Sequence, residues 1–231
     1  MKILAPVSCL VALVLPLAAA EVSGHVLVTR RLSKRAISPI VYNLRGTALP
    51  VPPPGPEPVN EFERMVVILE PAKNAGSISR PFPPKPPVTE TLDQRGARFE
   101  PDLIVVPVGS TVQFPNSDPI FHNVFSLSKA QPFDLGYYPQ GQSRGVKFNK
   151  PGVVQVYCHI HANMYAAIVV TASPWFGKPS GDGAFSFSNV PPGRYRLTAW
   201  HKIAGLHKID LDVPEAGLSG VTIRVPVDTE Q

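Results

Sequence analysis

The sequence predicts an all-β protein. Short apolar runs of alternating polarity recur along the chain and end at turn residues, and the 28 prolines make long helices improbable. Charged residues make up only 17% of the chain, and no long segment combines apolar residues at a period of 3.6 with helix caps. Two β-sandwiches joined by Pro-rich segments are therefore the expected architecture.

The first twenty residues predict a secretory signal peptide. A positive charge precedes the apolar run 3–17, and residues 18–20 give an A-x-A ending with cleavage before Glu21. A transmembrane anchor is the alternative, but two prolines interrupt a run that is already short for a bilayer span. The mature chain is thus expected to be periplasmic or secreted, with no stable membrane span.

Strands are expected before and between two Pro-rich segments. Residues 22–32 form the first strand and the apolar run 65–69 forms the second. The Pro-rich segments, 51–58 and 81–87, are typical of flexible or polyproline II-like linkers. Both segments are candidate domain boundaries, and the second gives a linker over residues 71–87.

A first sandwich is expected over residues 88–173. Its apolar runs are bounded by turns rich in Pro and Gly, which supply the backbone angles that tight turns need. The expected strands are 103–106, 111–114, 141–147, 153–157 and 166–170.

The C-terminal part alternates apolar and small residues at period two. The pattern DG-x-F-x-F begins at Asp182 and PPG-x-Y-x-L begins at Pro191. Both resemble the signature of the carboxypeptidase-regulatory-like or transthyretin-like β-sandwich. That resemblance implies one small sandwich built from residues 21–70 and 174–228, with the first sandwich inserted between them.

One loop of the inserted part carries soft metal donors. Cys158, His161 and Met164 follow a C-x2-H-x2-M pattern between two β-type runs, and a distant imidazole, His122, precedes Asn123. One Cys and two His with a weakly bound Met form the ligand set of mononuclear blue copper. Met is not a usual ligand of structural zinc. The donor types therefore predict one copper ion.

Over residues 88–172 this pattern resembles the cupredoxins, and the short ligand loop is most similar to that of amicyanin. The resemblance implies His122, Cys158 and His161 as strong ligands and Met164 as the axial ligand. It also implies that Asn123 ties the two ligand loops together. The combination with a second sandwich resembles exported plastocyanin-like proteins described as methylamine-utilisation-like. Many relatives have Pro where this chain has Ala162, which affects loop rigidity but not ligand identity.

Each donor alone has an ordinary structural role. A Cys at a strand end is usually a small buried hydrophobe, and a Met usually fills gaps in a core. Cys9 is expected to leave with the signal peptide, so Cys158 has no partner in the oxidising compartment to which the chain is exported. A metal that holds its sulfur as a thiolate resolves this difficulty.

Several other functions are disfavoured. The formal charge of +5 is mild and spread along the chain, and no recognition motif points to nucleic acid. Six histidines with a single H-x-H pair, at His159 and His161, cannot supply a trinuclear oxygen-reducing centre. We expect His159 to be a strand-face neighbour that tunes polarity, and His201 and His207 to have packing or surface roles.

The leading hypothesis is an exported electron carrier without substrate turnover of its own. His161 is expected to lie near the surface, and Ile120 and Phe121 are expected to contribute a docking patch for a transient redox partner. The alternative is a copper-binding structural, sensor or chaperone module. In that case the second sandwich binds a cell-surface partner or glycan.

Overall fold

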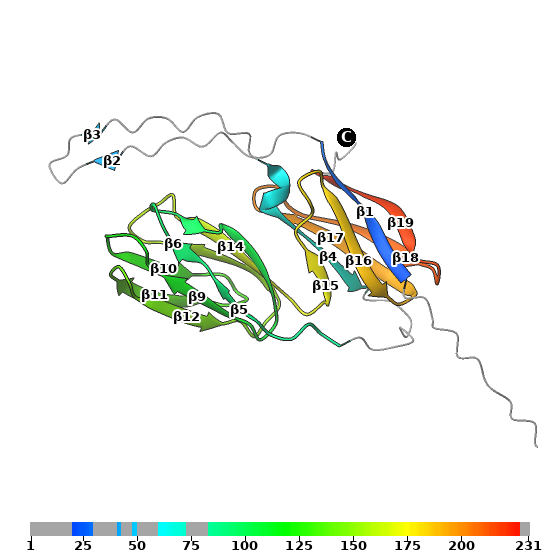
Figure 1. Cartoon of the computed structure of the whole chain (residues 1–231), viewed down its shortest axis with the longest axis horizontal. Helices are drawn as coiled ribbons and strands as arrows, with labels where there is room; N and C mark the ends of the chain where they lie inside the picture. The colour runs from blue at the N-terminus through cyan, green and yellow to red at the C-terminus, as the bar shows by residue number, and fades with distance from the viewer. Residues whose placement is uncertain (1–19, 30–40, 43–47, 50–59, 73–82, 227–231) are drawn as a thin grey trace, which may run out of the picture.

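The computed structural model (Figure 1) describes five ranges of the chain: residues 20–29, 41–42, 48–49, 60–72 and 83–226. Within these ranges every element is a strand except η1 (Glu61–Arg64), a 3-10 turn, so the all-β prediction is confirmed. No helix there is long and apolar enough to cross a membrane. Of the predicted signal peptide, only Ala20 is described, and it is buried. The segment 51–58 and part of the linker 71–87 lie outside the described residues.

One sandwich has two sheets around a shared core. The larger sheet has the strand order β11-β10-β13-β14-β8, and the smaller has the order β12-β9-β5. Each run expected to form a strand in this region does so. The strands are β5 (Thr89–Thr91), β6 (Asp93–Gln94), β7 (Phe99–Glu100), β8 (Leu103–Pro107), β9 (Thr111–Pro115), β10 (His122–Ser126), β11 (Phe133–Tyr138), β12 (Ser143–Lys147), β13 (Gly152–Tyr157) and β14 (Tyr165–Thr171).

Alternation along the strands decides which side chains fill this core. In β9, Val112 and Phe114 are fully buried while the residues on either side of them are partly exposed. Successive side chains of a strand point to opposite faces of the sheet, which accounts for the pattern. The same core includes Cys158 and Met164, so the loop that follows β13 begins and ends among buried apolar side chains.

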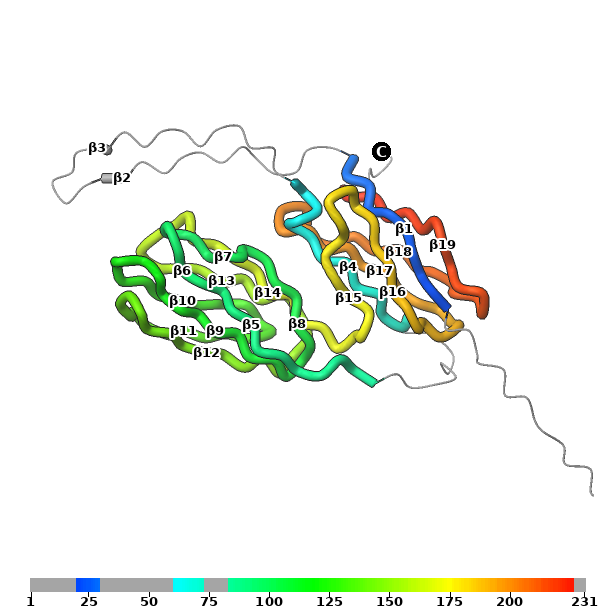
Figure 2. The backbone as a smooth tube through the Cα atoms, viewed as in Figure 1, coloured from blue at the N-terminus to red at the C-terminus, as the bar shows by residue number. Residues whose placement is uncertain are grey.

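A second core collects strands from distant parts of the chain. One of its sheets has the order β16-β1-β19 and the other β15-β4-β17-β18. Figure 2 shows β1 and β19 side by side, and they pair in parallel. Gly24 is required in β1 because a side chain there would collide with the carbonyl oxygen of Val221. The strands outside the first sandwich are β1 (Ala20–Val28), β2 (Val41–Tyr42), β3 (Ala48–Leu49), β4 (Met65–Pro71), β15 (Trp175–Gly177), β16 (Ala184–Val190), β17 (Gly193–His201), β18 (Gly205–Val213) and β19 (Leu218–Val225).

A third apolar layer joins the two sandwiches. Side chains of β4 and β17 pack there against side chains of β8 and β14. In β4, Met65, Val67 and Leu69 enter the second core, whereas Val66 and Ile68 face this layer. Both faces of β4 are thus buried, which explains why its sequence is apolar from Met65 to Leu69 instead of alternating. The buried residues of the layer are Val66, Ile68, Leu103, Ala167, Val169 and Trp200.

A buried lysine completes the contact between the sandwiches. Lys202, which follows β17, places its ammonium 2.6 Å from the carboxylate of Asp102 and donates to the carbonyl oxygen of Tyr165 at 3.1 Å. The same ammonium lies 4.5 Å from the centre of the Tyr165 ring. Burial lowers the pKa of Lys202, and the carboxylate of Asp102 acts against that shift. The charge therefore stays paired at the edge of the apolar layer.

A buried histidine holds η1 against the β17–β18 turn. The Nδ1 atom of His201 accepts hydrogen bonds from the amides of Ile203 and Ala204, both at 3.1 Å. Its Nε2 atom lies 3.3 Å from the carboxylate of Glu61. Because Nδ1 accepts two amide hydrogens, the ring carries its single proton on Nε2, and a second proton would break the turn.

The joining layer makes a measurable contribution to stability. Leu103→Ala removes a fully buried side chain from it and should lower the free energy of unfolding by about 2–5 kcal/mol, as measured by urea denaturation. Leu127→Ala is the matched control, because Leu127 is 82% exposed, and it should change stability by no more than about 0.5 kcal/mol. Equal effects of the two substitutions would show that the layer does not stabilise the fold.

Stability should also depend on the protonation of His201. Burial lowers the pKa of His201, with Glu61 opposing the shift, so below the ordinary value of about 6.5 the unfolded chain binds more protons than the folded one. The contribution of the neutral His201 ring to the free energy of unfolding is fully present above that pH, and it is lost as the pH falls toward the pKa of His201 in the folded chain. Glu61, Arg64 and His207 also face this ring.

His201→Asn isolates this effect, since the Asn carbonyl can accept the two amide hydrogens but does not titrate. Urea midpoints measured between about pH 7 and pH 5 should fall more steeply for the wild type than for the variant. Parallel pH profiles would contradict the assignment.

Candidate metal centre

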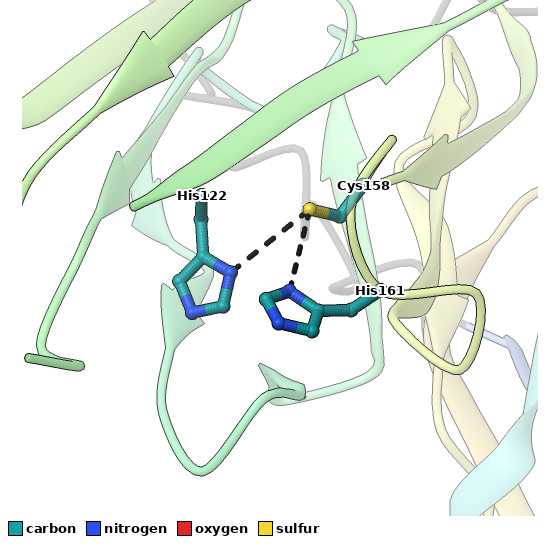
Figure 3. Close-up of side chains that lie close together, drawn as sticks. All are labelled: His122, Cys158 and His161. Atoms are coloured by element: carbon teal, nitrogen blue, oxygen red, sulfur yellow. Dashed lines mark hydrogen bonds between the residues drawn. The ribbon is translucent and has the colours of Figure 1, made fainter. Parts of the chain in front are cut away.

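Three donor side chains converge where two loops of the first sandwich meet (Figure 3). His122 is the first residue of β10, Cys158 directly follows β13, and His161 lies in the loop between β13 and β14. The Sγ atom of Cys158 is 3.9 Å from Nδ1 of His122 and 3.8 Å from Nδ1 of His161. The ligand atoms of all three residues lie within 4.8 Å of one another. The structure therefore brings together three of the four predicted ligands.

Strand pairing creates this convergence. Tyr157 pairs with Tyr165 across β13 and β14, so the seven-residue loop 158–164 must turn back within the same sheet. Tyr157 also pairs with Phe125 of the antiparallel strand β10, which places the start of β10 beside the loop that follows β13. A hydrogen bond of 3.0 Å from the amide of Met164 to the carbonyl oxygen of His161 tightens the loop.

The donors differ in their exposure to solvent. His122 is fully buried and Cys158 is 5% exposed, while His161 is partly exposed. Burial lowers the pKa of His161, and the neighbouring His122 lowers it further, while Asp118 opposes these effects. His161 is therefore more readily available as a neutral donor, with a free nitrogen lone pair, than an exposed imidazole would be.

A carboxylate holds the far side of the His122 ring. The Nε2 atom of His122 is 2.8 Å from Oδ2 of Asp118, which also accepts from the amide of Ala97 at 2.8 Å, while Oδ1 accepts from the amide of Gly96 at 2.6 Å. Burial raises the pKa of Asp118, but the bonds from the Ala97 amide, His122 and the Gly96 amide outweigh it, and the net shift is downward. A ligand-type histidine backed by a carboxylate is a common arrangement in metal sites.

A second carboxylate connects the two ligand loops. Asn123 donates to Asp134 at 2.7 Å, and Nε2 of His159 lies 3.5 Å from the same carboxylate. The His159 ring also stacks on Phe125, with centroids 3.8 Å apart and planes 4° apart. The residue after His122 is therefore linked through Asp134 to the residue after Cys158. The pKa of Asp134 is lowered, mainly by the hydrogen bond from the amide of Gly136 and next by the hydrogen bond from Asn123.

Met164 is buried, with 1% of its surface exposed, in the same core cluster as Cys158. Its role as the axial ligand stays a prediction. Asp118 and Asp134 were not singled out by the sequence. A signal for Asp118 exists in its position four residues before His122, but nothing local in the sequence marks Asp134.

The spacing of the three donors fits a bound transition-metal ion. A metal ion with bonds of about 2.0 Å to a nitrogen and about 2.3 Å to a sulfur, at a roughly trigonal angle, holds that nitrogen and that sulfur about 3.8 Å apart. This separation matches the distances from Sγ of Cys158 to Nδ1 of His122 and to Nδ1 of His161. One thiolate and two imidazoles suit a soft or borderline transition metal and not Mg²⁺ or Ca²⁺. Within the described part of the chain this is the one group of at least three His, Cys, Asp or Glu side chains that could hold a metal ion.

Solved structures similar to this chain include copper proteins. A purple cupredoxin from Nitrosopumilus maritimus is 22% identical over 36% of this chain and 99% of that chain, with a TM-score of 0.33. The Cu-containing nitrite reductase NirK from Thermus scotoductus SA-01 is 27% identical over 44% of this chain and 25% of that chain, with a TM-score of 0.34. A reduced mutant of amicyanin is 18% identical over 46% of this chain and 98% of that chain, with a TM-score of 0.34.

No protein-family model matches the chain, and no curated protein matches it in sequence. The structure itself shows two facing sheets in this region, with a Cys and two His side chains that converge from β10 and from the loop after β13.

Two neighbouring histidines allow a test of the site. His161→Ala should weaken Cu(II) binding by more than the roughly 10–100-fold that follows loss of a residue behind a ligand, whereas His159→Ala should leave the affinity nearly unchanged. The difference is expected because His161 faces Cys158 while His159 stacks on Phe125 outside the donor group. Competition titration with a chelator measures both. Similar losses for the two variants would refute the assignment of His161.

Proposed function

We propose that this chain is an exported copper protein that transfers single electrons. The observation that carries the proposal is a buried sulfur donor, the Sγ atom of Cys158, which lies between the ring nitrogens of His122 and His161. Met164 is the proposed axial ligand. Copper in such a ligand set cycles between Cu(II) and Cu(I) by accepting and releasing one electron.

The protein's contribution is to hold the donors still. The His122 ring is fixed on both sides, by Asp118 at Nε2 and by the donor group at Nδ1. Cys158 leaves the sheet directly after a paired residue, Tyr157, and has little freedom to move. Donors that keep their positions when the charge of the bound ion changes reduce the reorganisation that accompanies each transfer, which favours a carrier.

The exposed edge of His161 supports electron exchange with a partner. His161 is partly exposed, and Ile120, Phe121 and Ile160 are 44%, 57% and 51% exposed on the two ligand loops. Small apolar surfaces of this kind suit weak and transient complexes of redox proteins. We therefore assign this edge as the docking patch and a redox protein as the partner.

The proposed carrier has no substrate turnover of its own, because the four proposed ligands leave no coordination position for a substrate. Export is proposed from the signal-peptide prediction and agrees with the single free Cys of the described chain, Cys158. In an oxidising compartment, a thiolate that binds metal is protected from pairing with other thiols.

A copper-binding structural, sensor or chaperone module is the second candidate. The extensive apolar layer that joins the two sandwiches favours it, since a shuttle needs no second sandwich. In that case the second sandwich is proposed to bind a cell-surface partner. The electron self-exchange rate separates the two candidates, because a site that does not cycle rapidly is not a carrier.

The decisive experiment compares the wild type with two separate single variants, Cys158→Ser and Met164→Leu. Wild-type protein loaded with Cu(II) should show an intense visible absorption band from thiolate-to-copper charge transfer, and Cys158→Ser should lose it. Met164→Leu should keep the band, since three strong ligands remain, but change the reduction potential. Absorption and EPR spectra with bound-copper analysis measure these outcomes. A wild type without the band, or a Cys158→Ser variant that retains both band and copper, would reject the proposal.

A further inference from the structure

The two ring nitrogens of His122 have different and fixed environments. Nδ1 faces the Sγ atom of Cys158, and Nε2 lies 2.8 Å from Asp118. An ionised carboxylate only accepts hydrogen bonds, so Nε2 must carry the ring proton and Nδ1 must present a bare lone pair. Because His122 is fully buried, no solvent molecule substitutes easily for Asp118 as the acceptor.

Asp118 is itself held in place by its surroundings. Its two carboxylate oxygens accept from the amides of Gly96 and Ala97, and its own amide donates to the side chain of Asn116 at 3.0 Å. The Asn116 side chain then donates to the carbonyl oxygen of Ile120 at 2.8 Å. The turn that leads into His122 is thus fastened at both ends, and Asp118 cannot swing away without breaking several bonds.

We propose that Asp118 is a positioning residue that fixes the tautomer of His122 and favours Cu(II) over Cu(I) at the centre. This inference rests on the proposed copper function. The carboxylate lies one imidazole ring away from the metal-facing nitrogen, and its hydrogen bond makes that nitrogen a stronger donor. A negative charge at that distance attracts the more highly charged oxidation state more strongly. Loss of the carboxylate should therefore raise the reduction potential.

The test compares Asp118→Asn with Asp93→Asn. Asp93 is the matched control because its carboxylate accepts from Ser117 at 2.8 and 2.9 Å in the neighbouring turn, so the substitution removes the same charge without touching His122. Affinities for Cu(II) and Cu(I) are measured separately by chelator competition, and the reduction potential by voltammetry. Circular dichroism and urea denaturation verify that each variant folds.

Asp118→Asn should weaken Cu(II) binding by about tenfold or more, the scale seen when a residue behind a ligand is lost, and should weaken Cu(I) binding much less, so the ratio of Cu(II) affinity to Cu(I) affinity should fall. For a one-electron couple, a tenfold change in that ratio raises the potential by about 59 mV. Asp93→Asn should change the ratio far less. If Asp118→Asn folds and leaves the ratio unchanged, or if both variants change it equally, the positioning role is overturned.

A measurement on the metal-free protein separates this inference from the copper function. Nitrogen-15 NMR of the wild type should show His122 with its proton on Nε2 alone. A His122 ring protonated on Nδ1 in the wild type overturns the inference, even if Asp118→Asn does not fold. If the wild type shows the Nε2 proton but binds no copper with a visible band, the tautomer assignment stands, while the copper function and the preference for Cu(II) both fail.

Discussion

The pairing of β13 with both of its neighbours is the constraint on which the rest of the structure depends. Tyr157 pairs with Tyr165 on one side and with Phe125 on the other, so one residue fixes the register of three strands. Cys158 follows directly, and His122 begins the strand that contains Phe125. A slip of one residue in either pairing would turn the affected side chains to the opposite face of the sheet and separate the donors. Backbone hydrogen bonds thus place the three donors within reach of one another.

The second sandwich restrains the same sheet from behind. Ala167 and Val169 of β14 face the apolar layer shared with β4 and β17, while Ala166 and Ile168 face the core that contains Cys158. A strand that is buried on both faces cannot shift without opening a cavity on one side. The layer therefore stabilises the far end of the ligand loop as well as the contact between the sandwiches, and a rigid loop is what the proposed electron transfer requires.

Each ligand loop is also fastened by a carboxylate. Asp118 bonds directly to His122, whereas Asp134 acts on the neighbours of the ligands, Asn123 and His159. The two differ in burial, because the side chain of Asp118 is 10% exposed and that of Asp134 is 56% exposed. Solvent screens the charge of Asp134 more strongly, so Asp118 has the greater electrostatic influence on the centre.

The sequence alone determined the two strands that flank the ligand loop and the donors within that loop. Alternation at period two is a local property of a strand, and Cys158 and His161 lie three residues apart in one turn, so neither inference needs distant contacts. Tertiary structure decided the rest. The approach of His122 to Cys158 depends on strand register, and the role of Asp118 depends on amides of residues 96 and 97 on another loop. Such contacts join residues 20 or more positions apart, and side-chain periodicity carries no information about which loops will meet.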